Sequence, residues 1–296
     1  VSNYISPRYS LERNWLMPGN HAFEKKTFMP KLISKKTQII SIEPLINREL
    51  WRAAKRYPGE LHLSVNGPGK LGLMISGIIG STIEIIRARN ELDGVMIYNA
   101  PLYFVIPALI AKYILKMRVV FDMEDDYSKR SGHLSSKLGQ KIMLRCADEV
   151  IVPSHPCKAA LKNQGRPISV CNGYADFSYL DTIKQRNISY IRFIYAGSLD
   201  ALRGVDILPI LAEKFNASFG KRWSLTICGF GPKASEVAAI SRRFNSISFK
   251  GYVSETELNK CVEASDAALV LQPPDEPFSQ GSFPSKVMFY AKRSCP

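Results

Sequence analysis

The sequence has few of the features that are typical of metal-binding or membrane-spanning proteins. Its six cysteines form no Cys-x-x-Cys pair, and none of its four scattered histidines lies at ligand spacing from a cysteine. A zinc site is therefore not indicated. The most apolar stretch, 103–115, contains a proline and a lysine and is shorter than the ~20 residues that a spanning helix needs. Aromatic and basic residues are not interleaved in a pattern typical of nucleic-acid binding.

Positive charge is what the sequence has in excess. The net charge is +14 over 296 residues, and residues 1–175 hold 25 Lys and Arg against 14 Asp and Glu, a net of +11. This imbalance suggests an anionic partner such as phosphate groups or an acidic membrane surface, with ordinary solubility charge as the alternative. No signal peptide is recognisable, and Cys171 and Cys228 sit in apolar runs as free thiols do. We expect a cytoplasmic protein, with peripheral contact at the inner membrane face.

Short β-branched or aromatic runs alternate with longer helical patterns along the first half of the chain. Strands are predicted at 37–44, 61–66, 94–101, 118–124, 149–154 and 168–173, and helices at 21–34, 46–57, 70–90, 102–116, 132–146 and 155–164. Such alternation is typical of an α/β fold, in which helices cover both faces of a parallel sheet.

The polar stretch 176–189 has no sustained period and is interpreted as a linker. After it the alternation restarts, with strands at 190–197, 224–231, 247–253 and 267–273 and helices at 205–215, 233–244, 255–264 and from 284. We predict two Rossmann-like parallel-sheet domains that face a cleft, 1–175 and 190–296. The second is expected to be incomplete, because the sequence stops within an apolar pattern. Ligands of such sheets bind beyond the C-terminal strand ends.

Three strand-to-helix turns of the second half are rich in glycine or helix-capping residues. YAGSLDALRG at 195–204 places Arg203 and a glycine before a helix, CGFGP occupies 228–232, and QGSFPSK at 280–286 places a proline near a helix start. A cation and free amides at a helix start are the elements of a phosphate site. Each turn alone is a weak signal.

The order and spacing of these turns resemble the donor half of family 4 glycosyltransferases with the GT-B fold. The match covers most of 190–296 and includes FKGYV at 249–253. In the first half, 152–176 resembles the end of that family's acceptor domain, and 18–44 resembles its opening loop, first helix and second strand.

This resemblance implies a hexosyltransferase-type enzyme that moves a sugar from a nucleotide-diphosphate donor to an acceptor hydroxyl. Transfer would usually proceed with retention and without a metal or another cofactor. The acceptor would be a saccharide or a lipid-linked saccharide at the inner membrane face, as in polysaccharide biosynthesis. The alternative is a non-catalytic nucleotide-binding or scaffold module of the same fold.

The resemblance also assigns residues. On the donor side it assigns Gly197, Ser198, Arg203, Gly229, Gly251, Tyr252, Val253, Ser282, Ser285 and Lys286. Ser198 stands where the family has its first phosphate-binding cation, so Arg203 is the cation that remains. The loop Gly19, Asn20 and His21 would approach the donor from the acceptor side, and an ordinary surface loop is the alternative.

One departure concerns the last helix, where the family usually shows two glutamates eight residues apart. Gly281 and Phe289 stand at these positions. The second glutamate commonly holds the ribose hydroxyls, and a phenylalanine cannot accept a hydrogen bond from them. The ribose is then held differently, activity is weak or lost, or the alignment is shifted. A core aromatic is the plain interpretation of Phe289.

Four carboxylates follow the strand at 118–121, namely Asp122, Glu124, Asp125 and Asp126. The resemblance places Glu124 and Asp125 beside the transferred sugar. One would hydrogen-bond the sugar or the acceptor hydroxyl, and the other would stabilise positive charge on the ring. Asp122 is expected to face the other side of the strand, and Asp126 to cap a turn or the next helix.

Three alternative roles for this acidic cluster stay open. A Mg²⁺ or Mn²⁺ site suits clustered carboxylates, but it belongs to a fold without a second Rossmann-like unit. A phosphatase-like Asp-x-Glu site usually lies near the start of its domain, whereas at least three strands precede this one. The third is a solvated acidic turn among basic neighbours such as Lys129 and Arg130.

Overall fold

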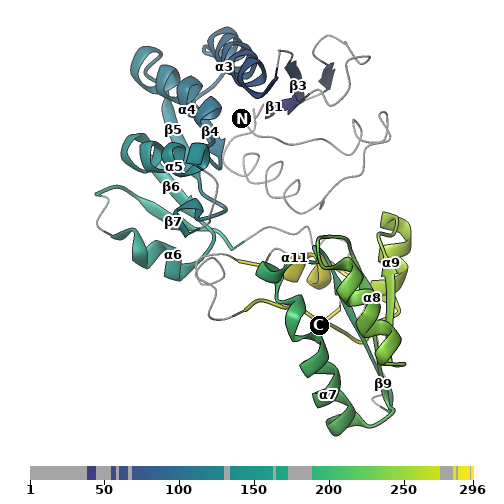
Figure 1. Ribbon diagram of the computed structural model, residues 1–296. Coiled ribbons are helices and arrows are strands. Elements are labelled where there is room, and N and C mark those ends of the chain that lie inside the picture. Colours follow the sequence, from purple (N-terminus) through teal and green to yellow (C-terminus); the bar gives the residue numbers. More distant parts are fainter. Residues whose placement is uncertain are drawn as a thin grey trace. The chain divides into compact units, whose positions relative to one another are not determined.

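The computed structural model describes residues 39–44, 55–57, 60–65, 69–129, 134–162, 165–172, 189–273, 283–284, 286–293 and 295–296. The chain divides into two compact units (Figure 1). Unit 1 lies mainly within Val1–Tyr174, and unit 2 comprises Ala175–Gln280 with Pro284–Pro296. The helix predicted at 21–34 lies outside the described residues.

Unit 1 is built on a parallel sheet in the order β4-β5-β6-β7. Its strands are β4 (Gly94–Tyr98), β5 (Arg118–Asp122), β6 (Glu149–Val152) and β7 (Ile168–Val170). Its helices are α3 (Gly69–Ala88), α4 (Leu102–Leu109), α5 (Leu134–Cys146) and α6 (His155–Ala160), with the 3₁₀ turn η2 (Tyr127–Lys129). Helix α4 lies between α3 and α5 and contacts both (Figure 1).

The core of unit 1 lies where neighbouring strands meet α4 and α5. Ile97, Phe121 and Val150 come from three adjacent strands and are fully buried together with Phe104 and Met143. Full burial of a side chain of this size stabilises the fold by about 1.5–3 kcal/mol. The β-branched and aromatic runs of the sequence therefore become the inner face of the sheet.

A smaller sheet of unit 1 corrects one element of the sequence-based prediction. It has the order β1-β3-β2, with β1 (Ile39–Pro44) parallel to β3 (Glu60–Val65) and β2 (Lys55–Tyr57) antiparallel to it. Residues 55–57 were predicted to end a helix, and that prediction is wrong. Pro58 follows them in the sequence, and a residue before proline is disfavoured in the helical region and favoured in the extended one.

The predicted helix at 102–116 changes its geometry halfway. It is α-helical through α4 and continues as a π-helical segment, η1 (Ile110–Ile114). The Leu115 amide donates to the carbonyl of Ile110 at 3.0 Å. Pro107 lies inside α4 and has no N–H to donate, so the regular hydrogen-bond ladder is already interrupted there.

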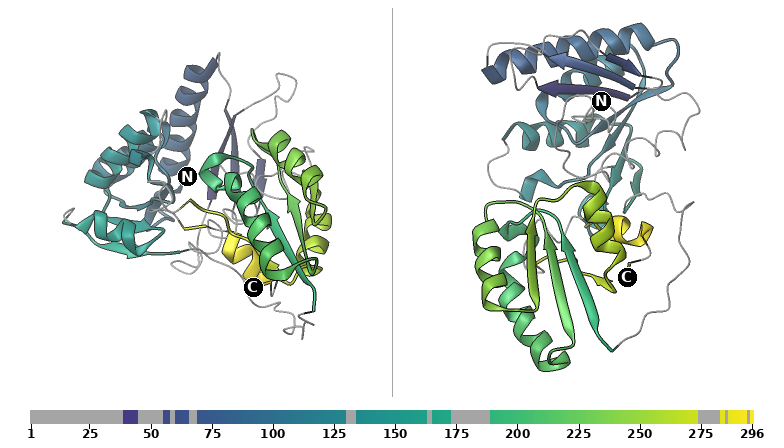
Figure 2. Two further views of the ribbon diagram at one scale, coloured as in Figure 1. Left: turned by 60° about the horizontal axis from the view of Figure 1, so that its bottom comes forward. Right: turned by 90° about the vertical axis from the view of Figure 1, so that its right-hand side faces the viewer.

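Unit 2 is built on a second parallel sheet, in the order β10-β9-β8-β11. Its strands are β8 (Ile191–Ala196), β9 (Trp223–Cys228), β10 (Ile247–Gly251) and β11 (Ala267–Ala268). Its helices are α7 (Leu208–Phe219), α8 (Ala234–Arg243), α9 (Glu255–Glu263) and α11 (Lys286–Lys292), with the 3₁₀ turns η4 (Ala201–Arg203) and η5 (Val205–Ile207). The right-hand view of Figure 2 shows helices on both faces of this sheet.

Successive residues of β8 enter two different cores, as the two-residue period of a strand requires. Phe193 and Tyr195 pack with Trp223 in the core that includes residues of α7 and α8. Ile194 and Ala196 pack in the core that includes residues of α9 and α11. The α/β class with parallel sheets in two units is confirmed, although β11 is only two residues of the strand predicted at 267–273.

Candidate functional site

Glycines bring the ends of β8 and β9 into close contact in unit 2. A Cβ atom added to Gly229 would overlap the carbonyl oxygen of Gly197, and one added to Gly231 would overlap that of Leu199. The Gly197 amide donates to the carbonyl of Cys228 at 2.9 Å, and the Gly229 amide donates to that of Gly251 at 2.8 Å. Backbone atoms of the strand ends therefore approach so closely that a side chain would not fit at Gly229 or Gly231.

Lys286, the first residue of α11, lies directly over this glycine-lined end. A Cβ atom at Gly197 would overlap the Cε and Nζ atoms of Lys286. The Nζ atom donates to the Tyr195 hydroxyl at 3.0 Å, and that hydroxyl donates to the Ser198 carbonyl at 2.8 Å. The lysine therefore needs a residue without a side chain beneath it, which Gly197 supplies.

Arg203 lies near enough to Lys286 to affect its protonation. Burial first and the positive charge of Arg203 second lower the pKa of Lys286 to about 8, while Asp200 opposes the shift. A neutral lysine is favoured when a cation is nearby and water is excluded. The charges of two of the predicted donor residues, Lys286 and Arg203, therefore interact, and Lys286 is the member of this cation pair that lies over Gly197.

Asp200 fixes the loop that carries Ser198 and Arg203. Its carboxylate accepts the Arg203 amide at 2.9 Å and the Ser198 hydroxyl at 2.7 Å. This is the side-chain capping expected of an aspartate ahead of a helical turn. The sequence analysis missed Asp200, although its position three residues before Arg203 is the usual capping signal.

The end of β10 carries a second feature, a pair of exposed aromatic rings. Gly251 has a left-handed φ of 67°, and Tyr252 follows it with 46% of its surface exposed. Phe230, between the two glycines of CGFGP, is 55% exposed, and its ring lies 5.7 Å from that of Tyr252 at 65°. Val253 packs against the core instead. Phe230 was not predicted, although an aromatic between two strand-end glycines was visible in the sequence.

Phe289 is a core residue of α11. It is 8% exposed, it packs in the core of Ile194 and Cys228, and the Arg293 guanidinium lies 3.8 Å from its ring centroid. The hydroxyl of the next residue, Tyr290, accepts the Ala196 amide at 2.8 Å. Both aromatics thus fix α11 against β8.

In unit 1, Asn99 holds the loop that carries Glu124 and Asp125. The Oδ1 atom of Asn99 accepts hydrogen bonds from the backbone amides of both residues at 3.1 Å. The backbone amide of Asn99 donates to the carbonyl of Asp122 at 2.8 Å. Asn99 adopts a left-handed φ of 46°, which asparagine tolerates better than most residues. The loop after β4 therefore positions the loop after β5.

The pKa of Tyr98 is affected by the negative charge around this loop. Its pKa is raised well above the usual value, first by burial and then by the charges of Glu124, Asp122 and Asp125. These carboxylates therefore gather near one phenol at the end of β4. Asp122 is only 2% exposed, so it does not belong to a solvated turn.

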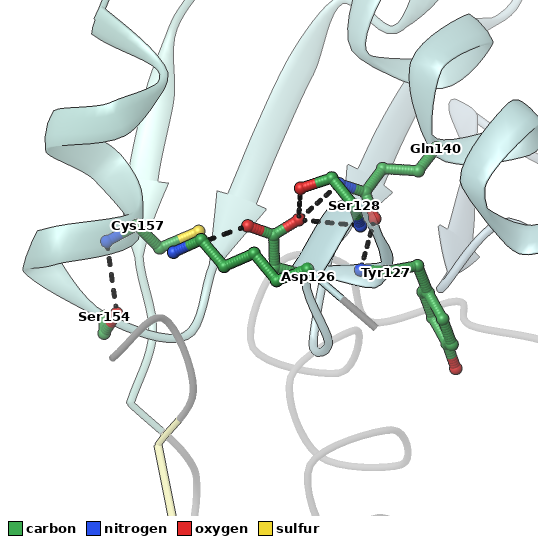
Figure 3. Close-up of polar contacts among 7 residues, drawn as sticks. Asp126, Tyr127, Ser128, Gln140, Ser154 and Cys157 are labelled. Atoms are coloured by element: carbon green, nitrogen blue, oxygen red, sulfur yellow. Dashed lines mark hydrogen bonds and ion pairs between the residues drawn. The ribbon is translucent and has the colours of Figure 1, made fainter. Parts of the chain in front are cut away.

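Asp126 has a structural role that the sequence predicted. Its carboxylate accepts the Ser128 amide at 3.1 Å, the Ser128 hydroxyl at 2.6 Å and the Gln140 Nε2 at 2.8 Å (Figure 3). Gln140 in turn accepts the Tyr127 amide at 2.8 Å. The expectation that Asp126 caps a turn is confirmed, and it ties η2 to α5.

Among the described residues we find neither a cluster of metal-ligating side chains nor a helix that could span a membrane. Within them, no group of three or more His, Cys, Asp or Glu side chains is placed to bind a metal ion. None of the helices they form has both the length and the apolar character needed to cross a membrane. The predicted residues outside them are Gly19, Asn20, His21, Gly281, Ser282 and Ser285.

An open pocket of about 590 Å³ lies in unit 2, but the predicted donor residues do not line it. It is bounded by residues of β8, β9 and β10 and by α9. Its lining residues are Arg192, Ser224, Thr226, Lys250, Ser254, Thr256, Glu257, Lys260, Cys261, Ala264 and Ser265. Glu124 and Asp125 belong to unit 1, whereas Gly197, Ser198, Arg203 and Lys286 are brought together within unit 2.

No protein-family model matches the chain, and no curated protein matches its sequence. Solved structures do resemble its fold. "Trehalose-6-phosphate from E. coli bound with UDP-2-fluoro glucose" is 8% identical with a TM-score of 0.55, and the match covers 80% of this chain and 72% of that one. The lipopolysaccharide outer core galactosyltransferase WaaB is 14% identical with a TM-score of 0.53, covering 80% and 64%.

A third structure, Anabaena Alr3699/HepE in complex with UDP and glucose, is 16% identical with a TM-score of 0.50. The match covers 74% of this chain and 62% of that one. The chain thus spans less than two thirds of the length of WaaB and of HepE. At such identities the likeness establishes the fold, an α/β chain of two Rossmann-like parallel-sheet units of the GT-B type.

Proposed function

We propose that the chain belongs to a GT-B glycosyltransferase resembling family 4. It would move a sugar from a nucleotide-diphosphate sugar to a saccharide or lipid-linked acceptor, with retention and without a metal. The observation that carries this proposal is the position of Lys286 over the glycine-lined end of β8, with Arg203 close enough for its charge to act on the lysine. Two of the solved structures with this fold are bound to UDP or a UDP-sugar.

The cation pair suits a diphosphate for an electrostatic reason. Burial and the charge of Arg203 both disfavour the charged form of Lys286. An anion bound near the two cations would offset this electrostatic cost of keeping the lysine protonated. Charge-assisted hydrogen bonds to phosphate are roughly twice as strong as neutral ones, and a guanidinium can make two in parallel. The same cations would stabilise the charge that develops on the departing diphosphate.

The exposed aromatic pair at the end of β10 suits the nucleobase. The face of a base stacks on aromatic side chains, a contact worth about 1–3 kcal/mol in single-stranded nucleic-acid binding. Tyr252 and Phe230 offer such rings next to Gly251 and Gly229, and Gly229 lies against the carbonyl of Gly197, the glycine beneath Lys286. Ser282 and Ser285 are proposed to add backbone amides at the start of the last helix.

Unit 1 is proposed to supply the acceptor side. Glu124 or Asp125 would hydrogen-bond the sugar or the acceptor hydroxyl, and the other would stabilise positive charge on the ring. Asn99 holds both amides, which restricts where these carboxylates can reach. Gly19, Asn20 and His21 would approach the donor, and we place the protein in the cytoplasm against an anionic membrane face, without a nucleic-acid partner.

The proposal is tested by titrating UDP, GDP and their sugars into the full-length protein by calorimetry. Arg203→Ala should lose roughly 1.5–3 kcal/mol of diphosphate affinity, the range for hydrogen bonds to charged groups. Arg243→Ala is the matched control, because Arg243 is an exposed arginine of α8 whose partner is Glu213. If neither nucleotide binds, or if Arg203→Ala binds like the parent, the donor site is elsewhere.

A second candidate function is a nucleotide-binding module of the same fold that does not transfer sugar. The burial of Phe289 favours it, because no carboxylate replaces the family's ribose-binding glutamate there. Nucleotide binding without turnover of any nucleotide-sugar would support the module over the enzyme.

A further inference from the structure

Two cysteines of unit 2 that the proposed function does not use come together beside the open pocket. Cys228 ends β9, is 2% exposed and belongs to the core of Ile194 and Val262. Cys261 lies on α9, is half-buried and packs against the same core. Cys261 also lines the pocket, so a small molecule in solution can reach its thiol while Cys228 lies behind it.

The two thiols are close enough to interact. Burial first, and then the charge of Cys261 and a hydrogen bond with it, raise the pKa of Cys228 to about 12. Cys228 therefore stays a protonated thiol at neutral pH, as a buried thiol does. Of the pair, Cys261 is the thiol that is placed to react first.

A lysine stands beside Cys261 in the pocket. Lys250 lines the same pocket and lies one residue before Gly251, which pairs with Cys228 in the sheet. The charge of Cys261 is the largest cause that raises the pKa of Lys250, and the carboxylate of Glu257, 3.5 Å from the ammonium, acts more weakly. A cation next to an accessible thiol favours the thiolate, which is the nucleophilic form of cysteine.

We propose that Cys261 and Cys228 are a peroxide-responsive thiol pair, which closes into a disulfide between α9 and the end of β9. The Cys261 thiolate attacks hydrogen peroxide, an S–O bond forms as the O–O bond breaks, and the departing hydroxide takes a proton to become water. The Cys228 sulfur then forms the S–S bond and displaces the second hydroxide, which leaves as water with the Cys228 proton. Two thiols are oxidised by two electrons in total, and one peroxide is reduced to two waters.

The bridge would lie next to the candidate donor site. The carbonyl of Cys228 accepts the Gly197 amide at 2.9 Å, and Gly229 follows Cys228 in the chain. A disulfide would tie α9 to this strand end and so restrict any movement of one against the other. The inference does not depend on sugar transfer or on nucleotide binding.

The test is peptide mapping of the full chain after brief treatment with hydrogen peroxide and blocking of the remaining thiols with N-ethylmaleimide. A linked pair of peptides containing Cys228 and Cys261 should be the main product and should disappear on reduction with dithiothreitol. Lys250→Met should form the bridge about two- to fivefold more slowly, the range for an exposed charge pair. The matched control is Lys260→Met, which removes an exposed lysine of the same pocket. It should react like the parent, because residue 260 points about 100° away from residue 261 on the helix.

A second variant checks the order of the two steps. In Cys261→Ser, Cys228 should stay reduced under the same treatment, because peroxide does not reach it directly. The proposal is overturned if the parent forms no bridge, if Cys295 of the same core is the main partner, or if Cys261 is oxidised to the sulfinic acid while Cys228 stays a free thiol. Equal rates in Lys250→Met and the parent would remove the lysine from it. The mapping of the parent needs no substitution, so it decides the proposal even if a variant fails to fold.

Discussion

The Nζ atom of Lys286 lies 3.0 Å from the Tyr195 hydroxyl and 4.3 Å from the centroid of its ring. The two residues are 91 positions apart, one at the start of α11 and the other in β8. This contact places a partly buried ammonium group at a strand end beside Gly197. The charges of Arg203 and Asp200 also act on it in opposite directions, and the lowered pKa shows that burial and the cation prevail. A donor diphosphate would supply the further anion that the ammonium favours.

The first prediction is that diphosphate binding depends on pH through Lys286. Its pKa is lowered to about 8, by burial first and by Arg203 second. Bound diphosphate favours the ammonium form and raises this pKa, so binding is accompanied by proton uptake near pH 8. Affinity should be highest below pH 8 and should fall as the pH rises above it. Titrations in buffers of different ionisation enthalpy measure the protons taken up.

Lys286→Met is the variant that checks the assignment. It should bind diphosphate more weakly than the parent below pH 8, and its affinity should be nearly independent of pH between 7 and 9. A variant that kept the parent's pH profile would assign the titration to another group.

The second prediction concerns stability without ligand. Between pH 8 and the ordinary lysine pKa of 10.5, the unfolded chain holds a proton at Lys286 that the folded chain has released. The free energy of unfolding therefore rises with pH across this window, and the penalty is fully present below it. Lys286→Met should be more stable than the parent at pH 7, on the order of 1–3 kcal/mol. Urea denaturation at pH 7 and pH 10 should show this advantage shrinking at the higher pH.

The third prediction concerns the glycines that join β8 to β9. In Gly229→Ala the new Cβ meets the Gly197 carbonyl oxygen, a backbone atom that cannot move aside, so unfolding should become easier by about 3 kcal/mol. The control is Gly220→Ala in the same unit. It has a left-handed φ of 61° but nothing within 4 Å of its Cβ, and backbone strain alone should cost it about 1 kcal/mol. Equal losses in urea denaturation would contradict the close approach.

The fourth prediction tests the structural role of Asp126. Gln140 is only 4% exposed, and its side-chain Nε2 atom donates to the Asp126 carboxylate. Asp126→Ala removes this acceptor. The cost should be about 2–3 kcal/mol of stability, because a buried donor is left unsatisfied. Asp126→Asn keeps one acceptor oxygen and should lose less. A loss of sugar transfer at unchanged stability would instead place Asp126 among the catalytic carboxylates.

The sequence predicted the elements of the fold well because its apolar periods are regular. The runs at 118–124 and 149–154 became β5 and β6, and the helix predicted at 70–90 is α3 within two residues. The error at 55–57 arose where a helical pattern runs into Pro58 and pairing with β3 decides the conformation. Pairing of this kind is a long-range contact, which a local pattern does not contain.

The sequence predicted residues of the candidate site only where a motif marks a position at which the backbone requires a particular residue type. Gly197 and Gly229 were assigned from the family resemblance, and the structure shows that Lys286 over Gly197 and the Gly197 carbonyl against Gly229 leave no room for a side chain at either position. Asp200 and Asn99 were missed, since their roles come from loops that fold back on themselves or on a neighbouring strand. The proximity of Lys286 to Gly197 was equally invisible, because 89 residues separate them and only the packing of α11 on β8 joins them.

The last prediction distinguishes residues that bind the nucleobase from residues that bind the phosphates. Tyr252→Ala and Phe230→Ala remove exposed rings that lie 5.7 Å apart at the end of β10 and β9. Each should weaken nucleotide binding by about 1–3 kcal/mol through lost stacking, yet leave the affinity for inorganic pyrophosphate unchanged. Arg203→Ala should weaken both ligands, because its contact is with phosphate. Tyr190→Ala, which removes another exposed ring of unit 2 (44% exposed), should change neither. If the aromatic variants lost pyrophosphate as well, the rings would be supporting the phosphate loop rather than a base.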